Sequence, residues 1–300
     1  MNSYLTKNGI KILKNEPLSR YTFTKTGGNA DYLAFPKDVE QVKKLMCFAS
    51  ERHYPVTVLG RASNLIIRDG GIRGLTMILT KMNKIKVRHH LIMADAGAPI
   101  IDVSVCAQKH SLSGLAFAAG IPGSVGGAIF MNAGAYGGST SQAVQSVVVL
   151  TPDHRVKKLT NQQLNFSYRY SLLQDQANWI VLSAKFKLSP GEPEIIRDQM
   201  DDFNAQRSSK QPLDFPSCGS VFKRPVGHYA GQLIHDAHLQ GYQSGGARVS
   251  RVHAGFIVNV GHATATDYLN VIHHVQHQVY MDSGVHLHLE VRIIGQKMDN

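Results

Sequence analysis

The sequence predicts an α+β protein of about two domains. Its 300 residues are 43% hydrophobic, enough apolar material for a sizeable core, and domains commonly hold roughly 150 residues each. Apolar residues alternate between Ile180 and Leu188, as in a half-buried strand, but recur at helical spacing between Val39 and Ala49. Both patterns are spread along the chain without an internal repeat, so strands and helices are expected to be mixed.

The first elements are a strand and a helix. Residues 26–36 contain two glycines and then a short apolar run, which predicts a turn followed by a strand. Asp38 suits a helix N-cap, and the amphipathic pattern over 39–49 predicts the helix itself. Pro55 stands beyond its expected end.

Strand and helix patterns then alternate. Val56–Leu59 and Leu65–Ile67 are compact apolar strands separated by the loop 60–64, so a strand-loop-strand unit is expected. A further strand over 91–96 precedes a candidate helix over 98–109.

The middle of the chain combines a glycine-rich tract with more sheet. The tract runs from Gly114 to Gly138 and is followed by a probable hairpin, whose strands 146–151 and 156–159 flank Pro152–Arg155. The alternating segment over 180–188 continues this sheet to about residue 190.

A domain boundary is expected near residue 205. The proline- and glycine-containing segment 189–193 ends the sheet, a polar helix fits 194–207, and 211–216 is expected to be an extended connector. The remaining elements predict an α+β lobe: a helix over 229–237, a strand over 256–260, a helix over 266–281 and a strand over 285–294.

Composition narrows the function classes. The three cysteines Cys47, Cys106 and Cys218 lie far apart, so neither a disulfide framework nor a C-x-x-C metal site is predicted. The formal charge of +11 is spread rather than clustered, which favours anionic small ligands such as nucleotides over nucleic acid. No stretch approaches the roughly 20 apolar residues of a membrane-spanning helix, and the first 21 residues lack a signal-peptide core. We therefore expect a cytoplasmic protein without membrane or nucleic-acid partners.

Histidines do not predict a metal site. His273 and His277 have the helical spacing of some zinc ligands, and His274 lies beside them, but no acidic residue completes an H-E-x-x-H pattern. His286 and His288 would share one face of a strand and are expected to be exposed. No metal is predicted.

The glycine-rich loops leave two interpretations open. No Walker loop and no Rossmann G-x-G-x-x-G pattern is present, which argues against the common nucleotide-binding folds. The loop 60–64 could hold an anion on its backbone N–H groups, or could be a plain turn. The segments Gly120–Gly127 and Asn132–Gly138 could let a flat ring or a pyrophosphate approach the backbone, or could serve tight packing.

Several ordered motifs resemble one enzyme family. They are Thr26-Gly-Gly28, Leu59-Gly-Arg-Ala-Ser-Asn-Leu65, Gly120-Ile-Pro-Gly-Ser-Val-Gly-Gly127, Met131-Asn-Ala-Gly-Ala-Tyr136, Tyr168-Arg169 with Ser171, Cys218-Gly-Ser-Val-Phe-Lys-Arg-Pro225, His253-Ala-Gly-Phe-Ile-Val-Asn259 and Glu290-Val-Arg-Ile-Ile-Gly295. Nearly the whole chain resembles the UDP-N-acetylenolpyruvoylglucosamine reductase family. The short spacing from Arg169 to Ser220 resembles its shorter, type II branch.

The resemblance implies a fold and a reaction. The fold would be a two-subdomain FAD-binding region of the vanillyl-alcohol-oxidase (PCMH) type over 1–205, with subdomains of about 1–80 and 81–205, and a C-terminal α+β substrate-binding domain over 206–300. NADPH would reduce non-covalently bound FAD, and N5 of the flavin would pass hydride to C3 of UDP-N-acetylglucosamine enolpyruvate. The product would be UDP-N-acetylmuramate, made for peptidoglycan and thus for cell-wall biogenesis, cell shape and cell division.

The resemblance also assigns residues. Ser220 would donate the proton to C2, Arg169 would stabilise the charge that develops, and Glu290, with a raised pKa, would be its partner. The flavin contacts implied are Gly60, Arg61, Ala62, Ser63, Asn64, Leu65, Gly120, Pro122, Gly123, Ser124, Gly127, Gly134 and Val181. Substrate or nucleotide contacts would be Tyr168, Arg207, Gln211, Lys223 and His253.

Three residues depart from the pattern of the family. Ala62 stands where many relatives have glycine in the phosphate loop, so φ at this position is expected to be negative. Ala116 replaces a common acidic residue, and Arg224 stands where the longer branch tends to have asparagine. Flavin affinity is therefore left open.

Two other functions are kept as alternatives. One is a flavin oxidase of the same superfamily that acts on an alcohol or sugar, although no His or Cys tether motif for flavin is recognisable. The other is a nucleic-acid-binding protein, which only the basic charge supports. A monomer is expected, with an oligomer left open.

Overall fold

The computed structural model describes residues 9–298 and divides them into two compact units. Unit 1 contains Tyr32–Arg61 and Gly74–Arg207, together with the described residues up to Lys14. Unit 2 contains Asn15–Asp31, Ala62–Arg73 and the described residues from Ser208 onward. Two segments that precede residue 205 therefore belong to the same compact unit as the C-terminal residues. The sequence division at about 205 did not anticipate this interleaving.

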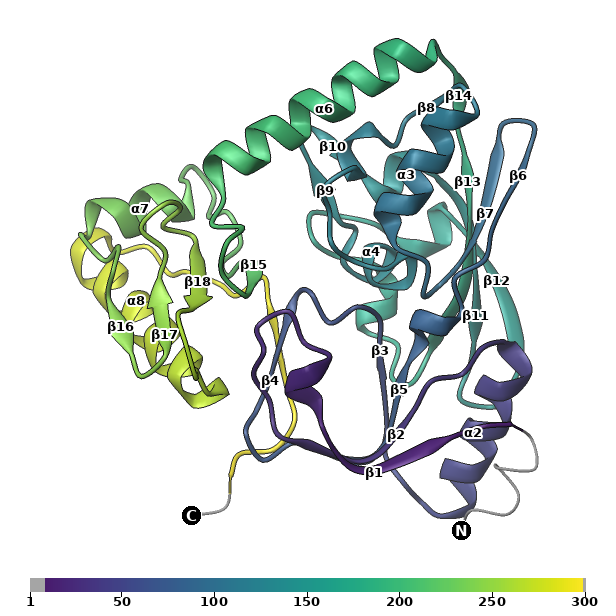
Figure 1. Ribbon diagram of the computed structural model, residues 1–300, viewed down its shortest axis with the longest axis horizontal. Coiled ribbons are helices and arrows are strands. Elements are labelled where there is room, and N and C mark those ends of the chain that lie inside the picture. The colour runs from purple at the N-terminus through teal and green to yellow at the C-terminus, as the bar shows by residue number, and fades with distance from the viewer. Residues whose placement is uncertain (1–8, 299–300) are drawn as a thin grey trace. The chain divides into compact units, whose positions relative to one another are not determined.

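Unit 1 is built on a five-stranded antiparallel sheet. Its strand order is β12 (Val156–Thr160), β11 (Val144–Leu150), β13 (Ile180–Lys187), β7 (Leu91–Asp95) and β6 (Ile85–Arg88). The helices α3 (Ile100–Lys109) and α4 (Val125–Met131) lie against one face of this sheet (Figure 1). Buried Ile92, Ala94 and Phe186 point to that face, because side chains alternate along a strand.

A second sheet and the first helix complete the core of unit 1. The sheet has the order β1 (Ile12–Pro17), β2 (Asn29–Ala34), β5 (Ile72–Ile78) and β3 (Val56–Leu59), and β3 runs parallel to β5. The helix α2 spans Val39–Glu51, and the Asp38 carboxylate accepts a hydrogen bond from the backbone N–H of Gln41, at 2.8 Å. Asp38 is thus the N-cap that the sequence predicted.

Short elements surround the glycine-rich tract of unit 1. They are β8 (Leu112–Ser113) paired with β14 (Ser189–Pro190), β9 (Gly134–Ala135) paired with β10 (Gly138–Ser139), and α5 (Thr140–Ala143). The polar helix α6 spans Pro193–Lys210. Single 3-10 turns of unit 1 occupy Leu79–Lys81, Ala116–Ala118, Gln162–Leu164 and Leu172–Gln174, and one in unit 2 occupies Leu18–Arg20.

Unit 2 holds a four-stranded antiparallel sheet and two helices. The strand order is β15 (Ser217–Ser220), β18 (Phe256–Asn259), β17 (Ala247–Val249) and β16 (Gln243–Ser244). The helices are α7 (Ala230–Asp236) and α8 (Ala265–Ser283). Fully buried Tyr268 on α8 lies in the apolar core of this unit.

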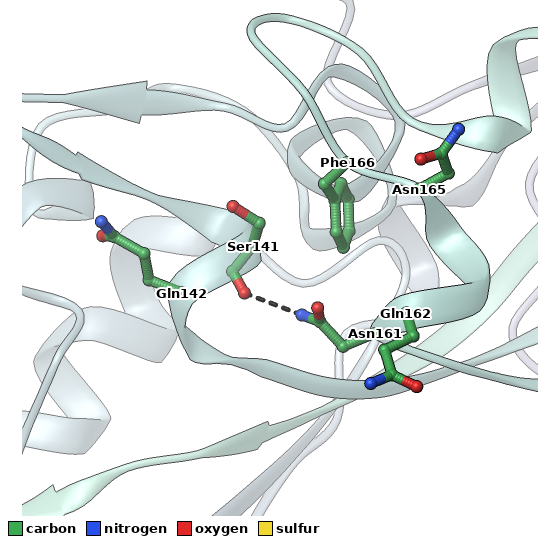
Figure 2. A pocket seen from close by; sticks show the side chains of 6 residues that line it. All are labelled: Ser141, Gln142, Asn161, Gln162, Asn165 and Phe166. Atoms are coloured by element: carbon green, nitrogen blue, oxygen red, sulfur yellow. Dashed lines mark hydrogen bonds between the residues drawn. The ribbon is translucent and has the colours of Figure 1, made fainter.

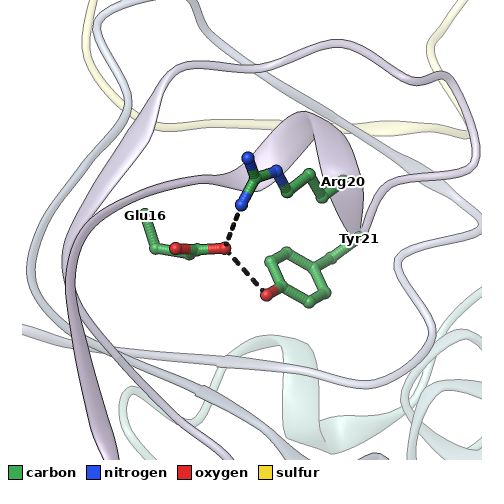
Figure 3. A network of polar contacts seen from close by, with 3 residues as sticks. All are labelled: Glu16, Arg20 and Tyr21. Carbon is green, nitrogen blue, oxygen red and sulfur yellow. Dashed lines mark hydrogen bonds and ion pairs between the residues drawn. The ribbon is translucent and has the colours of Figure 1, made fainter.

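The two early segments of unit 2 are fixed by specific bonds. The strand β4 (Leu65–Ile67) pairs in parallel with β19 (Arg292–Ile294). The Asp69 carboxylate accepts the N–H groups of Ala265 and Thr266, both at 2.8 Å, and so caps α8. Within the segment 15–31, the Glu16 carboxylate accepts hydrogen bonds from Arg20 and Tyr21 (Figure 3).

The structure corrects several predicted elements. The strands 56–59 and 65–67 exist as predicted, but they pair in different sheets and do not form one strand-loop-strand unit. The strand expected over 285–294 is confined to Arg292–Ile294. The segment 211–216 contains a turn, closed by hydrogen bonds that Leu213 and Phe215 donate to Gln211 and Pro212, rather than an extended connector.

No helix among residues 9–298 combines the length and the apolar character needed to cross a membrane.

Candidate active site

Ser220 and Glu290 come together within unit 2. Ser220 ends β15 at a register shift and lies opposite Phe256 of β18. The next residue, Val221, accepts a hydrogen bond from the backbone N–H of Glu290, at 2.8 Å. A β-bulge commonly redirects a side chain beside a functional site, and here it brings two predicted catalytic residues onto adjoining backbone.

His253 lies in the same part of unit 2. A Cβ added at Gly255 would lie 3.1 Å from Cε1 of His253 and 3.3 Å from Oγ of Ser220, so the two side chains flank one glycine. Nδ1 of His253 lies 3.1 Å from the backbone N–H of Gly255, which donates to it. The proton of the neutral ring is therefore on Nε2. Burial lowers the pKa of His253 below its ordinary value, which favours this neutral form.

Lys223 and Asn64 complete this group of polar residues. Lys223 is half-buried and donates its backbone N–H to His288, at 2.8 Å. The Asn64 side chain donates to the backbone carbonyl of Glu290, at 3.3 Å, next to the pairing of β4 with β19. The loop predicted for phosphate is thus bonded directly to the backbone of the residue that carries the predicted catalytic carboxylate.

Arg169 lies in unit 1, at the tip of a tight turn. Ser167 and Tyr170 exchange backbone hydrogen bonds of 3.2 Å, which makes Tyr168 and Arg169 the two central residues. The φ of Arg169 is +55°, a left-handed conformation that arginine rarely adopts. Such strain persists where the surroundings impose it, and it is concentrated at functional sites. The Arg169 guanidinium carbon lies 5.2 Å from the centre of the Tyr168 ring.

The turn is anchored on the end of α4. Buried Ser171 donates its hydroxyl to the carbonyl of Phe130, at 2.8 Å. Gln174 donates to the carbonyls of Phe130 and Arg169, at 2.9 and 3.0 Å, and Asn132 donates to that of Ser167, at 2.8 Å. These bonds explain why Ser171 belongs to the Tyr168-Arg169 motif: it orients the backbone that carries the arginine.

The backbone conformation of the loop 60–65 differs from the expected one. Ala62 has a φ of +51°, so the expectation of a negative φ was wrong. Its carbonyl accepts the N–H of Phe23, at 3.3 Å, and its side chain is buried. These surroundings within unit 2 are what hold an alanine in a conformation that usually requires glycine.

The left-handed conformation of Ala62 suits anion binding. Successive N–H groups turn toward one point when a left-handed residue stands in such a loop. Among residues 9–298, no protein acceptor bonds the backbone N–H groups of Ala62, Ser63 or Asn64. A run of uncommitted donors favours the anion-binding interpretation of this loop over a plain turn.

The tract 120–127 plays a different part. The first N–H groups of α4, from Val125, Gly126 and Gly127, donate to Ala98, Ala96 and the Ser124 hydroxyl at 2.8, 2.8 and 3.3 Å. These amides are committed within the protein. A Cβ at Gly60 would overlap Oγ of Ser124, so the two glycine loops touch within unit 1. The space beside Gly120 and Gly126 is filled by Arg207 and Ala96, so these two glycines serve close packing, whereas Gly127 is exposed.

Arg207 packs against the same tract. A Cβ at Gly120 would overlap its guanidinium, and Tyr136, which stacks on Phe203 with ring centres 4.5 Å apart, hydrogen-bonds to it. Burial lowers the pKa of Arg207, and the Tyr136 hydroxyl acts in the opposite direction. The result is a largely buried cation beside glycine backbone. Tyr136 was not predicted as a site residue, although it ends one of the family motifs.

The predicted site residues divide between the units. Unit 1 contains Gly60, Arg61, Gly120, Pro122, Gly123, Ser124, Gly127, Gly134, Tyr168, Arg169, Val181 and Arg207. Unit 2 contains Ala62, Ser63, Asn64, Leu65, Gln211, Ser220, Lys223, His253 and Glu290. Val181 is buried opposite Val149 in the large sheet.

An open pocket of about 360 Å³ lies elsewhere in unit 1 (Figure 2). It is lined by Ser141, Gln142, Asn161, Gln162, Asn165 and Phe166. None of these residues is a predicted site residue, and none is charged. Asn161 uses its amide group to bond the carbonyls of Ser141 and Val144, at 2.7 and 2.8 Å, so it stabilises the local backbone.

Histidines beyond His253 have structural neighbours. His274 stacks on Tyr242, with ring centres 3.8 Å apart, and His286 stacks on Tyr280, at 4.2 Å. Within residues 9–298, no three His, Cys, Asp or Glu side chains gather in a metal-binding arrangement.

Comparisons with known proteins agree on one kind of enzyme. A family profile described as "FAD binding domain" matches residues 30–160, and one described as "UDP-N-acetylenolpyruvoylglucosamine reductase, C-terminal domain" matches residues 211–294. Curated proteins named UDP-N-acetylenolpyruvoylglucosamine reductase from Levilactobacillus brevis and Limosilactobacillus reuteri are 59% and 58% identical to this chain. Each match covers 96% of this chain, and 94% and 96% of those proteins, respectively.

A solved structure extends the comparison to three dimensions. The crystal structure of UDP-N-acetylenolpyruvylglucosamine reductase from Thermus caldophilus matches with a TM-score of 0.81 at 30% identity. The match covers 95% of this chain and 98% of that one.

Proposed function

Since this chain belongs to the UDP-N-acetylenolpyruvoylglucosamine reductase family, we propose that it reduces UDP-N-acetylglucosamine enolpyruvate to UDP-N-acetylmuramate with NADPH. The family that the sequence motifs predicted is confirmed. The observation that carries the proposal is the identity of 59% over 96% of the chain. The protein is an FAD-dependent oxidoreductase of peptidoglycan precursor synthesis.

The residues present fit FAD. The free N–H groups of Ala62, Ser63 and Asn64 suit its pyrophosphate. Gly127 is exposed, and a Cβ added there would meet only Oγ of Ser124, at 3.5 Å, so a flat ring can approach the backbone at this position. When bound, FAD would supply the redox chemistry, which is the transfer of hydride from NADPH to the enolpyruvyl group. The thiol of buried Cys218 has a pKa raised to about 12, which makes it a poor candidate for a covalent flavin tether.

Ser220 is assigned the role of donating a proton to C2 of the substrate. A serine hydroxyl is a weak acid, so its neighbours must stabilise the alkoxide or return a proton. Lys223 follows on the same segment, and neutral His253 flanks Gly255 on the other side. This arrangement supports proton donation by Ser220.

Arg169 and Glu290 are assigned to the charge that develops on C2 and the substrate carboxylate. The planar donor fork of a guanidinium suits a carboxylate in its enolate form. The strained, firmly anchored turn supports a fixed position for Arg169, and fixed charges stabilise transition states more than mobile ones. A protonated Glu290 would donate a hydrogen bond to the same charge.

The remaining assignments follow the same reasoning. Arg207, a largely buried cation beside glycine backbone, suits a phosphate group. The side chains assigned to contact the substrate or NADPH are Tyr168, Gln211, Lys223 and His253. At the level of domains, the region up to about residue 205 is assigned to FAD binding and the region beyond it to substrate binding. We further propose a cytoplasmic monomer.

The test is an anaerobic spectrum of the purified flavoprotein. Addition of NADPH should bleach the flavin absorbance, and subsequent addition of UDP-N-acetylglucosamine enolpyruvate should restore it. Bleaching that only oxygen reverses, with oxygen consumption and no product, would identify a flavin oxidase instead.

A further inference from the structure

The large sheet of unit 1 carries a block of cations on the face that α3 and α4 leave open. Two rows of directly paired residues form it: Lys86, Met93 and Lys185 in one row, and Arg88, Leu91 and Lys187 in the other. We call these six residues the basic face. They come from β6, β7 and β13, which lie side by side in the sheet (Figure 1).

The side chains of the basic face point to solvent. Their neighbours along the strands, Ile92, Ala94 and Phe186, are buried toward the helices, so the alternating residues lie on the opposite side. Lys86, Arg88 and Lys187 are exposed, Lys185 is half-buried and Met93 is 38% exposed. Strand geometry spaces the four cations about 7 Å apart along a strand and about 10 Å apart across two strand spacings.

The charge of this face is not offset by ion pairs. Across residues 9–298, none of its four cations forms a salt bridge. The half-buried acid on the same side, Asp95, accepts the backbone N–H of Lys84, at 3.2 Å. Lys158, exposed and opposite Val148, extends the positive charge toward the far edge of the sheet. Because these cations form no ion pairs within the described part of the protein, they contribute little to its folding stability. Their charge is available to bind an anionic partner.

We propose that the basic face docks on the surface of an anionic lipid bilayer. The paired strands present their cations side by side on one broad face, and a bilayer presents its phosphates over a broad surface. Exposed Met93 and half-buried Leu91 lie between the cations, where apolar atoms can enter the boundary between headgroups and acyl chains. Single-stranded nucleic acid is bound through stacking on aromatic side chains, and none of the six residues is aromatic. The inference departs from the sequence expectation of no membrane partner.

The association would be weak and reversible. Each lysine or arginine close to an anionic surface strengthens binding by about fivefold, the equivalent of about 1 kcal/mol. Four cations thus give on the order of several hundredfold at low salt. Screening shortens the Debye length from about 30 Å at 0.01 M salt to about 8 Å at 0.15 M, so the binding should fall steeply between these concentrations.

The experiment is sedimentation of the full-length holoenzyme with vesicles of phosphatidylglycerol and phosphatidylcholine, beside vesicles of phosphatidylcholine alone. The test variant is K86Q/R88Q/K185Q/K187Q. The control variant, K14Q/K37Q/K109Q/R197Q, removes the same charge from exposed positions off this face. At low salt the test variant should lose on the order of several hundredfold in affinity for the anionic vesicles, and the control should lose less than about threefold. Flavin absorbance and NADPH turnover of both variants verify their folding.

Three outcomes would overturn the proposal. Equal weakening by both variants would make the overall charge responsible rather than this face. Tighter binding of single-stranded RNA that depends on the same four residues would assign the face to nucleic acid. The third is no binding of the wild-type enzyme to anionic vesicles at low salt. Met93→Ser should weaken vesicle binding a few-fold and leave RNA binding unchanged.

Discussion

Two opposing contributions to stability act at Ala62, the strain of its backbone and the burial of its side chain. A left-handed conformation costs an alanine about 1 kcal/mol, and burial of its methyl group returns about 0.8 kcal/mol. Ala62→Gly should therefore change the free energy of unfolding by less than about 0.5 kcal/mol. Ala62→Val should cost more than about 2 kcal/mol, because a β-branched residue tolerates positive φ poorly.

Urea denaturation of the two variants measures this difference. Ala94→Gly is the matched control, since Ala94 is equally buried but lies in a regular strand. It should cost about 1 to 2 kcal/mol. A cost of that size for Ala62→Gly would mean that position 62 is unstrained.

Ser220→Ala separates the two halves of the proposed reaction. Flavin reduction by NADPH should keep its rate, because the hydroxyl acts only on the enolpyruvyl substrate. Product formation should fall by about 10² to 10⁴, the usual contribution of general acid catalysis. Stopped-flow absorbance of the flavin measures both steps, and Ser217→Ala, on the same strand, should leave both within a few-fold. Slow flavin reduction with normal product formation would refute the role of Ser220.

His253 adds a pH dependence to stability. Its pKa is lowered by burial, whereas the unfolded chain takes up the proton near about pH 6.5. The unfolded state therefore binds a proton before the folded state does as the pH falls below about 6.5, and stability decreases. The loss should be less than about 1 kcal/mol, because the ring is partly exposed and solvent screens its charge.

The comparison is between wild type and His253→Gln, unfolded in urea at pH 7.5 and at pH 5.5. The variant should lose less stability over this interval than the wild type. An equal loss in both would show that His253 does not titrate differently in the folded state.

At the scale of elements, the turn that carries Arg169 depends on its attachment to α4. Ser171→Ala removes a hydrogen bond to a carbonyl in a fully buried setting and should cost about 1 to 2 kcal/mol. Product formation should decrease more than flavin reduction, because the proposed role of Arg169 belongs to the second half-reaction. Ser167→Ala, at an exposed position of the same turn, should leave stability and both rates nearly unchanged.

Local signals predicted the helices well. Asp38 caps α2, and the helix predicted over 266–281 lies within α8, because caps and periodicity act over a few residues. The strands β1, β5 and β6 were not singled out in the sequence. The pairing of β4 with β19 could not be predicted from local sequence patterns either, since it joins residues more than 200 positions apart.

The predicted site likewise has features that local sequence predicted and features that distant residues determine. The motifs identified Ser220, His253 and Glu290, and the structure brings these three together in unit 2. They gave no sign that Ala62 is left-handed, because its conformation is set by Phe23 and other distant residues of unit 2. Tyr136 and Gln174 were missed because each acts on another site residue, Arg207 and Arg169 respectively. Tyr136 ends a motif but had no role assigned to it, and Gln174 lies outside the motifs.

At the scale of the molecule, the interleaved segments predict the behaviour of fragments. A chain of residues 206–300 retains β15 to β18 but lacks β4, the Asp69 cap of α8 and the carbonyl of Thr24 that accepts from Asn259. Although it matches the predicted C-terminal domain, it should be largely unfolded. Circular dichroism and a thermal melt measure this. A cooperative transition close to that of the intact protein would contradict it.

The pairing of β4 with β19 also sets the order in which the protein can assemble on the ribosome. Asn64 bonds a residue 226 positions later, so its partner is not yet translated when Asn64 leaves the exit tunnel. At about 5 to 20 residues per second the interval is roughly 10 to 45 s. During it the loop that we assign to phosphate has no strand to fix it, so nascent chains should acquire the cofactor only after synthesis ends.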